Sequence, residues 1–321
     1  MSRLFRDVDA GPRCPHGSVV CIGAFDGLHL GHRALVRHAV ARAHALGVPA
    51  IAVTFEPLPR EFFAPAAPPP RLLKARAKVE GLHALGVDQV GLLRFNARLS
   101  GLDAEAFVRR VLVEHLSARE VWVGPGFRFG KGRAGDIDTL RRVGSAHGLV
   151  AGEIEPVMLD GERVSATRIR AALAAGDFEV AARLLGRPYA IGGRVVRGRQ
   201  LGRTLGFPTA NIRFAGKMPA LSGIYATWVH GVGSTPGESR PMPSVSSLGT
   251  RPTVDGVEPL LEAHLFDFDG DLYGRRIEVE FVAKLRDEEK FDDLPALVAQ
   301  MHRDAEAARR ILSEEQLRAT V

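Results

Sequence analysis

The pattern of apolar residues changes character near Gly186–Pro188. Before that point, short β-branched runs alternate with amphipathic helical patterns, which predicts a parallel sheet covered by helices. After it, short β-rich runs separated by Gly, Pro and Asp turns predict an all-β barrel or sandwich. We therefore expect two domains, an α/β domain over residues 1–186 and a β domain over residues 187–321.

Strand and helix patterns follow one another at short intervals in the first half. The strand-like runs are residues 18–22, 50–55, 89–93 and 121–123, and the helical patterns cover 32–46, 74–85, 104–116, 137–147, 167–175 and 178–185. Asp103 is a predicted N-cap and Gly176 a predicted helix stop. Because the carboxyl ends of parallel strands meet at one edge of a sheet, we expect a ligand site there.

The second half carries six β-rich runs, at residues 189–196, 209–214, 223–232, 244–249, 260–268 and 276–285. A helical pattern then closes the chain, with apolar residues recurring at the helical period. These are Leu294, Leu297, Met301, Ala305, Ala308 and Leu312. The expected fold class is therefore α/β plus β, with a helix closing the second domain.

Composition and charge argue against several classes of protein, among them nucleic-acid-binding, membrane and disulfide-rich proteins. The 43 basic and 37 acidic residues give a net charge of +6, which suits an anionic partner. Only 7% of residues are aromatic, and no run alternates basic with aromatic side chains, which argues against nucleic acid as the partner. No window approaches about 18 apolar residues, residues 1–17 hold no signal-like apolar core, and two cysteines make no disulfide framework. We expect a cytoplasmic protein without a membrane partner.

The loop after the first strand-like run has the sequence GAFDGLHLGH, residues 23–32. His29 and His32 lie where the next helix begins, and a helix N-terminus favours phosphate. The backbone can approach a ligand closely at three glycines, Gly23, Gly27 and Gly31. The loop predicts a triphosphate site that stabilises charge on the α-phosphate. A glycine-rich turn with incidental histidines is the alternative.

A second anion site is predicted where another helix begins, in SATRIR at residues 165–170. The hydroxyls of Ser165 and Thr167 stand about one turn ahead of the guanidinium of Arg170. Hydroxyls at a helix start are first of all caps, so this motif gains weight from lying in the same half as the two histidines. The glycines near Phe127 match neither a dinucleotide-binding motif nor a Walker A loop, which argues against an NAD enzyme or a P-loop NTPase.

Three glycines lie close together in the second half, before a fixed turn. They are Gly198, Gly202 and Gly206, followed by Pro208. With Arg203 they predict a flexible basic loop over phosphates, and a glycine-rich hairpin is the alternative. Thr209 and Asn211 supply neutral oxygens, which suit Mg²⁺ when phosphate oxygens and water complete the ligand set.

Glu262 lies in an apolar strand pattern, LLEAHL, where an unpaired carboxylate would be costly. A primary hydroxyl that attacks phosphorus benefits from a carboxylate that accepts its proton, so Glu262 is a candidate base. Strand alternation also allows it to face solvent. His264 is interpreted as structural. The carboxylates from Asp267 to Asp271 lack the glutamate of an EF-hand and predict a turn.

These motifs resemble the prokaryotic bifunctional riboflavin kinase/FAD synthetases. GAFDGLHLGH is similar to that family's nucleotidyltransferase signature, and SATRIR is similar to its second motif. The likeness covers nearly the whole chain through FEPLPREFF, GFRFGKGRAGD, GRQLGRTLGFPTANI, SLGTRPT and KLRDEEKF. It implies a Rossmann-like nucleotidyltransferase domain with a parallel sheet, then an antiparallel β-barrel riboflavin kinase domain with a closing helix.

The resemblance implies two Mg²⁺-dependent reactions with ATP as co-substrate. The C-terminal domain would transfer the γ-phosphate of ATP to riboflavin, giving FMN. The N-terminal domain would join FMN to the AMP moiety of ATP, giving FAD and pyrophosphate. The implied partners are riboflavin, FMN, FAD and ATP.

The resemblance also implies roles for single residues. His29 and His32 would stabilise the α-phosphate, Glu262 would be the kinase base, and Thr209 and Asn211 would hold the nucleotide-bound Mg²⁺. The implied ATP-binding residues of the first domain are Gly23, Phe25, Asp26, Gly27, Gly31, Ser165, Thr167 and Arg170. Those of the second domain are Gly198, Gly202, Arg203, Gly206 and Pro208.

Three places in the first domain depart from the family pattern. Ala24 stands where many members carry Asn, Ala166 replaces a serine, and Pro125 and Gly126 replace acidic or amide residues. A lost hydrogen bond to a ligand costs about 0.5–1.5 kcal/mol, which is roughly threefold to tenfold in flavin binding or FAD synthesis. A riboflavin kinase with a slow or regulatory adenylyltransferase domain is therefore the alternative function.

Overall fold

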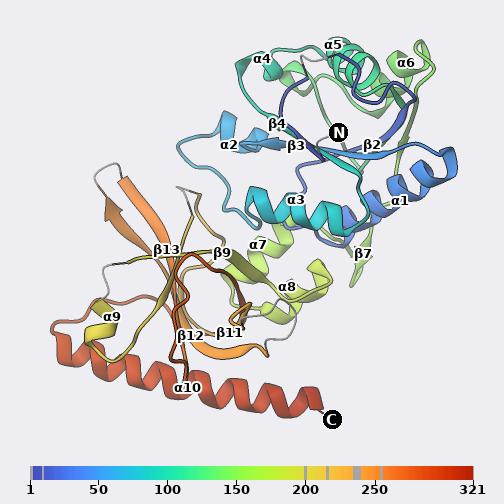
Figure 1. Ribbon diagram of the computed structural model, residues 1–321. Helices are drawn as coiled ribbons and strands as arrows, with labels where there is room; N and C mark the ends of the chain where they lie inside the picture. The colour runs from blue at the N-terminus through green and yellow to red at the C-terminus, as the bar shows by residue number, and fades with distance from the viewer. Residues whose placement is uncertain are drawn as a thin grey trace. The chain divides into compact units, whose positions relative to one another are not determined.

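The chain folds into two units, the first built on an open parallel sheet and the second on a closed barrel (Figure 1). The first unit comprises Met1–Pro69 and Ala75–Ala166, and the second comprises Pro70–Lys74 and Thr167–Val321. The structure is a computed structural model that describes residues 3–8, 11–198, 201–214, 217–233, 240–253 and 256–320.

The sheet of the first unit has six strands in the order β1-β4-β3-β2-β5-β6, and every neighbouring pair is parallel. The strands are β1 (Leu4–Phe5), β2 (Ser18–Ile22), β3 (Ala50–Glu56), β4 (Gln89–Arg94), β5 (Ala118–Val123) and β6 (Val150–Glu153). The predicted parallel sheet is confirmed. The sequence pattern missed β1 and β6, because these edge strands are short and bury few residues.

Helices flank this sheet, and the longest, α1, packs against β2, β3 and β5. They are α1 (Leu30–Leu46), α2 (Pro59–Phe63), α3 (Ala75–Ala84), α4 (Ala97–Ser100), α5 (Ala104–Phe107) and α6 (Ile137–Ser145), with a 3₁₀ turn η2 (Lys131–Arg133). A small hairpin pairs β7 (Met158–Leu159) with β8 (Glu162–Arg163). The predicted cap is present, since the Asp103 carboxylate accepts a hydrogen bond from the Ala106 amide at 2.7 Å.

The helix predicted over 104–116 changes type partway along. After α5 it continues as a π-helical segment, η1 (Val108–His115), which buries Val108, Val111 and Leu112 in the core of the first unit. The amide of Leu116 donates to the carbonyl of Val111. Periodicity alone does not separate this wider winding from an ordinary helix.

Six antiparallel strands close the barrel of the second unit, in the order β10-β13-β12-β11-β14-β9. They are β9 (Ala190–Val196), β10 (Ala210–Arg213), β11 (Gly223–His230), β12 (Met242–Thr253), β13 (Gly256–Leu265) and β14 (Arg276–Arg286). Each coincides with one of the six β-rich runs of the sequence. The barrel is therefore the fold that this half adopts, and the sandwich is not.

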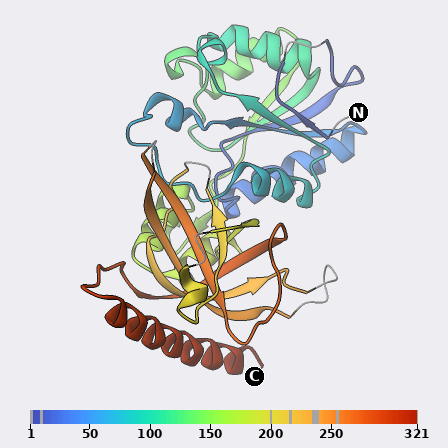
Figure 2. The same cartoon turned by 60° about the vertical axis from the view of Figure 1, so that its left-hand side comes forward.

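Helices accompany the barrel within the same unit. They are α7 (Ala166–Ala174), α8 (Phe178–Leu185), α9 (Leu201–Thr204) and α10 (Leu294–Thr320). The terminal helix α10 runs along the outside of the barrel and packs against β11, β12 and β14 (Figure 2). Its buried residues Ala308 and Leu312 contact a cluster that includes Val245 and Phe266. The predicted closing helix is confirmed.

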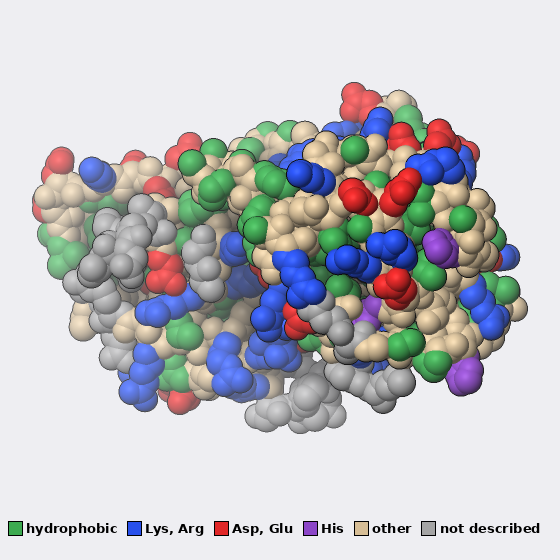
Figure 3. Space-filling view, turned by 90° about the horizontal axis from the view of Figure 1, so that it is seen from above, with side chains coloured by type: hydrophobic (Ala, Val, Ile, Leu, Met, Phe, Trp, Pro, Cys, Tyr) green, Lys and Arg blue, Asp and Glu red, His purple; other side chains and the backbone are tan. Residues whose placement is uncertain are grey.

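On the face drawn in Figure 3, Lys and Arg side chains gather in several groups with Asp and Glu side chains between them. In the part of the chain that the structure describes, no helix is long and apolar enough to cross a membrane.

Candidate functional site

The loop between β2 and α1 carries the first candidate site, at the carboxyl edge of the parallel sheet. His29 is the N-cap of α1, and its Nδ1 accepts a hydrogen bond from the backbone amide of His32 at 3.3 Å. Since Nδ1 is the acceptor, the proton of a neutral His29 ring lies on Nε2. The loop reaches this geometry through positive φ angles at Phe25, Gly27 and Leu28.

The rings of His29 and His32 are stacked, with their centroids 3.7 Å apart and their planes inclined by 19°. Phe25 is fully buried and meets His32 edge to face at 5.3 Å. Burial, His29, Lys78 and Arg163 together hold the pKa of His32 well below its usual range. His32 is therefore neutral near pH 7, and its Nδ1 is buried without a hydrogen-bond partner.

The loop rests on the neighbouring strand β3. The hydroxyl of Thr54 donates to the carbonyl of Ala24 at 3.1 Å, and the fully buried ammonium of Lys78 donates to that hydroxyl at 3.3 Å. Asp26, from the loop itself, is 2% exposed. A buried cation, a buried carboxylate and two imidazoles thus lie around one short loop, and the imidazole pair at the N-terminus of α1 is the part suited to an anionic ligand.

The segment before Ser165 passes beside the same loop. A Cβ on Gly31 would lie 3.2 Å from the His29 ring and 3.8 Å from the carbonyl of Val164, so the chain is close-packed here. Arg163 contributes to the low pKa of His32 and donates to the carbonyl of Pro125 at 2.9 Å. Within the first unit, Arg163 and Val164, the residues just before the second predicted motif, therefore lie near the two histidines.

The rest of that motif belongs to the second unit. Thr167 is exposed in the first turn of α7, and Nε of Arg170 donates to the carbonyl of Pro70 at 2.7 Å. The departure from the family pattern at Pro125 and Gly126 lies in the first unit. There the backbone amide of Gly126 donates a hydrogen bond to the Glu153 carboxylate at 3.1 Å. Ligand binding by Ser165, Thr167 and Arg170 stays a prediction.

An aromatic cluster at the carboxyl ends of β3 and β4 escaped the sequence analysis. Phe62 and Phe63 from α2 and Phe95 after β4 pack edge to face on one another, and Phe55 of β3 contacts Phe95. Phe63 is 65% exposed. The signal was the aromatic content of FEPLPREFF, but only the parallel pairing of β3 with β4 brings Phe95 to it.

The glycine-rich loop of the second unit connects β9 with β10. Arg199 and Gln200 lie outside the described residues, Gly198 precedes them, and Arg203 is exposed on α9. A Cβ on Gly202 would collide with the carbonyl of Phe207, whose amide donates back to Gly202 at 2.7 Å.

The end of this loop is fixed against β13. Gly206 takes a φ of +83°. Nδ1 of His264 then donates to the carbonyl of Pro208 at 2.9 Å. Burial lowers the pKa of His264. This hydrogen bond fixes the turn that precedes Thr209, which is consistent with the structural role expected for His264.

Asn211 and Glu262 are direct cross-strand partners on β10 and β13. Side chains in such pairs have Cβ atoms about 5 Å apart on the same face of the sheet. Asn211 is 5% exposed; its amide donates to the carbonyl and the hydroxyl of Thr209 at 3.1 and 3.4 Å. Its Oδ1 is buried without a hydrogen-bond partner. Glu262 is half-buried, so it is not a fully exposed surface carboxylate.

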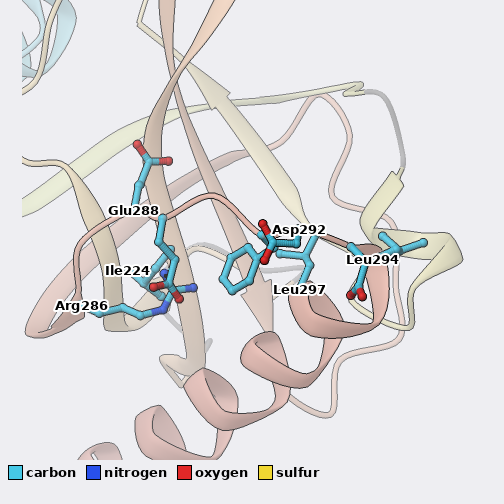
Figure 4. A pocket seen from close by; sticks show the side chains of 9 residues that line it. Ile224, Arg286, Glu288, Asp292, Leu294 and Leu297 are labelled. Atoms are coloured by element: carbon cyan, nitrogen blue, oxygen red, sulfur yellow. The ribbon is translucent and has the colours of Figure 1, made fainter.

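A cavity of about 530 Å³ lies between the end of β14 and the start of α10. Its apolar lining is Ile224, Phe291, Leu294 and Leu297, and its charged lining is Arg286, Glu288, Glu289, Asp292 and Asp293. Arg286 and Glu288 stand toward one end and Asp292, Leu294 and Leu297 toward the other (Figure 4). No local pattern in the sequence indicates this pocket, because β11, β14 and α10 come together only in the folded unit.

Glu288 of the pocket lies against Gly249 of β12, whose partner on β13 is Leu260, two residues before the candidate base Glu262. Partial burial raises the pKa of Glu288, Arg286 opposes the rise, and the neighbouring charge of Glu262 adds to it. A pocket that combines apolar side chains with convergent charged groups near a candidate base has the character of a small-molecule site.

Comparison with known proteins matches the two halves separately. A family model described as FAD synthetase matches residues 11–168, and one described as riboflavin kinase matches residues 185–312. The bifunctional riboflavin kinase/FMN adenylyltransferase of Pseudomonas fluorescens is 46% identical over 92% of this chain and 93% of its own. The protein of the same description from Escherichia coli K12 is 41% identical over 96% and 97%. The chain belongs to the bifunctional riboflavin kinase/FMN adenylyltransferases.

Members of this family are transferases, and the chain has both activities, riboflavin kinase and FMN adenylyltransferase. Riboflavin, FMN, FAD and ATP are its substrates and products. The two matched domains in one chain support this function over a kinase with a merely regulatory first domain.

A solved structure also shares the fold along nearly the full chain. It is described as a macrolide-efflux protein from Streptococcus pneumoniae, is 30% identical, and aligns with a TM-score of 0.74 over 95% of this chain and 98% of that chain. The word efflux in that description refers to the Streptococcus protein only.

Proposed function

We propose that the carboxyl edge of the parallel sheet is the adenylyltransferase site and that the barrel face bearing Asn211 and Glu262 is the kinase site. The assignment corresponds to residues 1–186 for adenylyl transfer and 187–321 for the kinase. It is supported by the order of the two matched family models along the chain.

In the adenylyltransferase, His29 and His32 stabilise the charge that builds on the α-phosphate of ATP as the FMN phosphate attacks it. Support comes from the stacked pair at the N-terminus of α1 and from the unpartnered Nδ1 of His32. Gly23, Phe25, Asp26, Gly27 and Gly31 shape the loop around the nucleotide. For Ser165, Thr167 and Arg170, the support is the resemblance of SATRIR to the family's second motif.

The aromatic cluster around Phe63 gives this site a surface for a flavin ring. A planar, largely apolar ring gains from packing on exposed aromatic faces. The cluster lies at the carboxyl ends of β3 and β4, at the same sheet edge as the histidine loop. We therefore assign the flavin of FMN to this cluster.

In the kinase, Glu262 accepts the proton of the riboflavin 5′-hydroxyl. The observation that carries this role is the register that sets Glu262 directly opposite Asn211. The loop residues Gly198, Gly202, Arg203, Gly206 and Pro208 cover the ATP phosphates. The pocket beside Glu262 receives riboflavin, with its apolar lining against the flavin ring.

Thr209 and Asn211 fit a Mg²⁺ ion. The orphaned, buried Oδ1 of Asn211 is a hard neutral oxygen, and the Thr209 hydroxyl lies 3.4 Å from Nδ2 of the same side chain. When bound, Mg²⁺ would neutralise charge on the ATP phosphates. A Cβ on Gly198 would lie 2.8 Å from Oδ1 of Asn211, so glycine keeps the space at this oxygen open.

We place the enzyme in the cytoplasm, where ATP is available and thiols stay reduced. Cys14 and Cys21 are both buried free thiols, which suits such a compartment.

The test is a time course with riboflavin, ATP and Mg²⁺, in which riboflavin, FMN and FAD are separated chromatographically. FMN should form first and FAD should follow, and EDTA should stop both steps. In Asn211→Ala, FMN formation should require more Mg²⁺ while FAD formation from supplied FMN keeps its Mg²⁺ dependence. An unchanged Mg²⁺ requirement for FMN formation would remove Asn211 from the metal site.

A further inference from the structure

A partly buried ion pair joins the terminal helix to the end of β14. Asp304 of α10 is 6% exposed, and its carboxylate accepts hydrogen bonds from Nε and Nη2 of Arg286 at 3.0 and 2.7 Å. Gln300, one turn earlier, donates to the same carboxylate at 2.8 Å. The two-point contact fixes the plane of the guanidinium as well as its position.

The Arg286 guanidinium also contacts the segment that follows β14. Its Nη1 donates to the carbonyl of Asp287 at 2.9 Å and lies 3.5 Å from the carboxylate of Glu289. Its guanidinium stands 5.7 Å from the centre of the Phe291 ring. Arg286, Glu289 and Phe291 all line the pocket that we assign to riboflavin.

The same arginine acts on the charged end of the pocket. Arg286 lowers the pKa of Glu288, whereas burial and the charge of Glu262 raise it. An arginine that lost its fixed orientation would change the shape of the pocket and the charge facing it. Asp304 itself does not line the pocket.

We infer that Asp304 is a positioning residue for the kinase: through Arg286 it holds the segment 287–291 in the conformation that receives riboflavin. This inference rests on the proposed location of the riboflavin pocket. Asp304 therefore affects the affinity for riboflavin. It does not affect ATP binding at the phosphate-binding loop or the adenylyltransferase activity.

A second ion pair on the same helix supplies the matched control. Arg309 donates to both carboxylate oxygens of Asp267 at 2.7 and 3.0 Å, and thereby also ties α10 to the barrel. Asp267 is exposed and does not line the pocket. Asp304→Asn and Asp267→Asn make the same chemical change, and they differ in whether Arg286 loses the charge of the carboxylate that holds it to α10.

The experiment measures steady-state kinase kinetics and riboflavin affinity in the full-length enzyme, the latter from flavin fluorescence. Asp304→Asn should raise the KM and Kd for riboflavin about tenfold, with kcat and the KM for ATP within twofold. FAD formation from FMN should not change. Asp267→Asn should leave the riboflavin KM unchanged.

A double-mutant cycle tests whether the effect passes through Arg286. In an Arg286→Lys background, adding Asp304→Asn should change the riboflavin KM less than twofold. Equal effects of the two Asp→Asn variants, or independent effects in the cycle, would overturn the inference. These outcomes would mean that Asp304 only anchors the helix.

Leu297→Ala separates this inference from the proposed pocket. If riboflavin binds there, losing the leucine side chain weakens its binding whatever Asp304 does. Weaker binding in Leu297→Ala with unchanged binding in Asp304→Asn would overturn the positioning role alone. Unchanged binding in both variants would overturn the pocket assignment and the inference together.

Discussion

His29 and His32 stack with their ring centroids 3.7 Å apart, and the backbone amide of His32 donates to Nδ1 of His29. Two imidazolium ions could not lie this close without strong repulsion, so the stack requires at least one neutral ring. The low pKa of His32 meets this requirement. The same geometry gives His29 two roles, one as helix cap and one as a candidate ligand of phosphate.

The two roles of His29 can be separated by substitution. Asparagine is a good N-cap, whereas alanine is not and costs the helix about 1 kcal/mol. His29→Asn should therefore keep the melting temperature but lower FAD formation from FMN about a hundredfold, the usual loss for one transition-state donor. FMN formation should stay within twofold in the same preparation. FAD formation near the parental rate in His29→Asn would show that His29 is only a cap.

The low pKa of His32 should appear in the pH dependence of stability. Below about pH 6.5 the unfolded chain binds a proton at this ring, and the folded first unit binds it only at lower pH. The free energy of unfolding should therefore fall as pH falls from 6.5, by at most about 1.4 kcal/mol per pH unit from His32. His38, whose pKa is also lowered by burial, adds a contribution of the same sign.

Urea unfolding at pH 5.0 and 7.5 measures this dependence. Trp122 lies in the first unit and Trp228 in the second, so a Trp228→Phe background makes tryptophan fluorescence report on the first unit. Adding His32→Gln should reduce the difference in unfolding free energy between the two pH values. The same difference with and without His32 would contradict the burial of its neutral ring.

Glu262 should matter to one reaction only. Glu262→Gln keeps the size and polarity of the side chain but removes its ability to accept a proton. FMN formation should fall by a factor of about 100 to 10,000, while FAD formation from supplied FMN stays unchanged. Glu280→Gln is the control, because Glu280 is a half-buried barrel carboxylate that bonds to His230. Phosphorylation of riboflavin at the parental rate in Glu262→Gln would refute the base role.

The departure from the family pattern at Gly126 can be reversed. Gly126 has a φ of +71°, which asparagine tolerates better than most residues, and a Cβ there meets no atom within 4 Å. Gly126→Asn should lower the KM for FMN by roughly threefold to tenfold, the effect of one restored hydrogen bond.

Gly148 offers a matched control for that variant. It has the same φ of +71° and the same open surroundings, but it precedes β6 and so lies away from the carboxyl edge of the sheet. Gly148→Asn should leave the KM for FMN unchanged. If both variants change it equally, the gain does not come from contact with the flavin nucleotide.

The secondary structure was largely predictable because its signals are local. The runs at 18–22 and 178–185 match β2 and α8 residue for residue, and all six β-rich runs became barrel strands. The candidate phosphate-binding residues were recognisable too, since glycines, histidines and hydroxyls at a strand-to-helix junction are suited to binding an anion at a helix N-terminus. Local patterns failed at η1, where the helix widens without a change in hydrophobic spacing.

The sequence by itself determined the two patterns of secondary structure, the loops that can bind phosphate, and the family resemblance. Tertiary structure alone decided that Glu262 faces Asn211, that Phe95 joins Phe62 and Phe63, and that Asp304 reaches Arg286. The physical reason is that each of these contacts depends on strand register, sheet order or barrel closure. A shift of one residue in register would turn Glu262 to the other face without altering any local pattern.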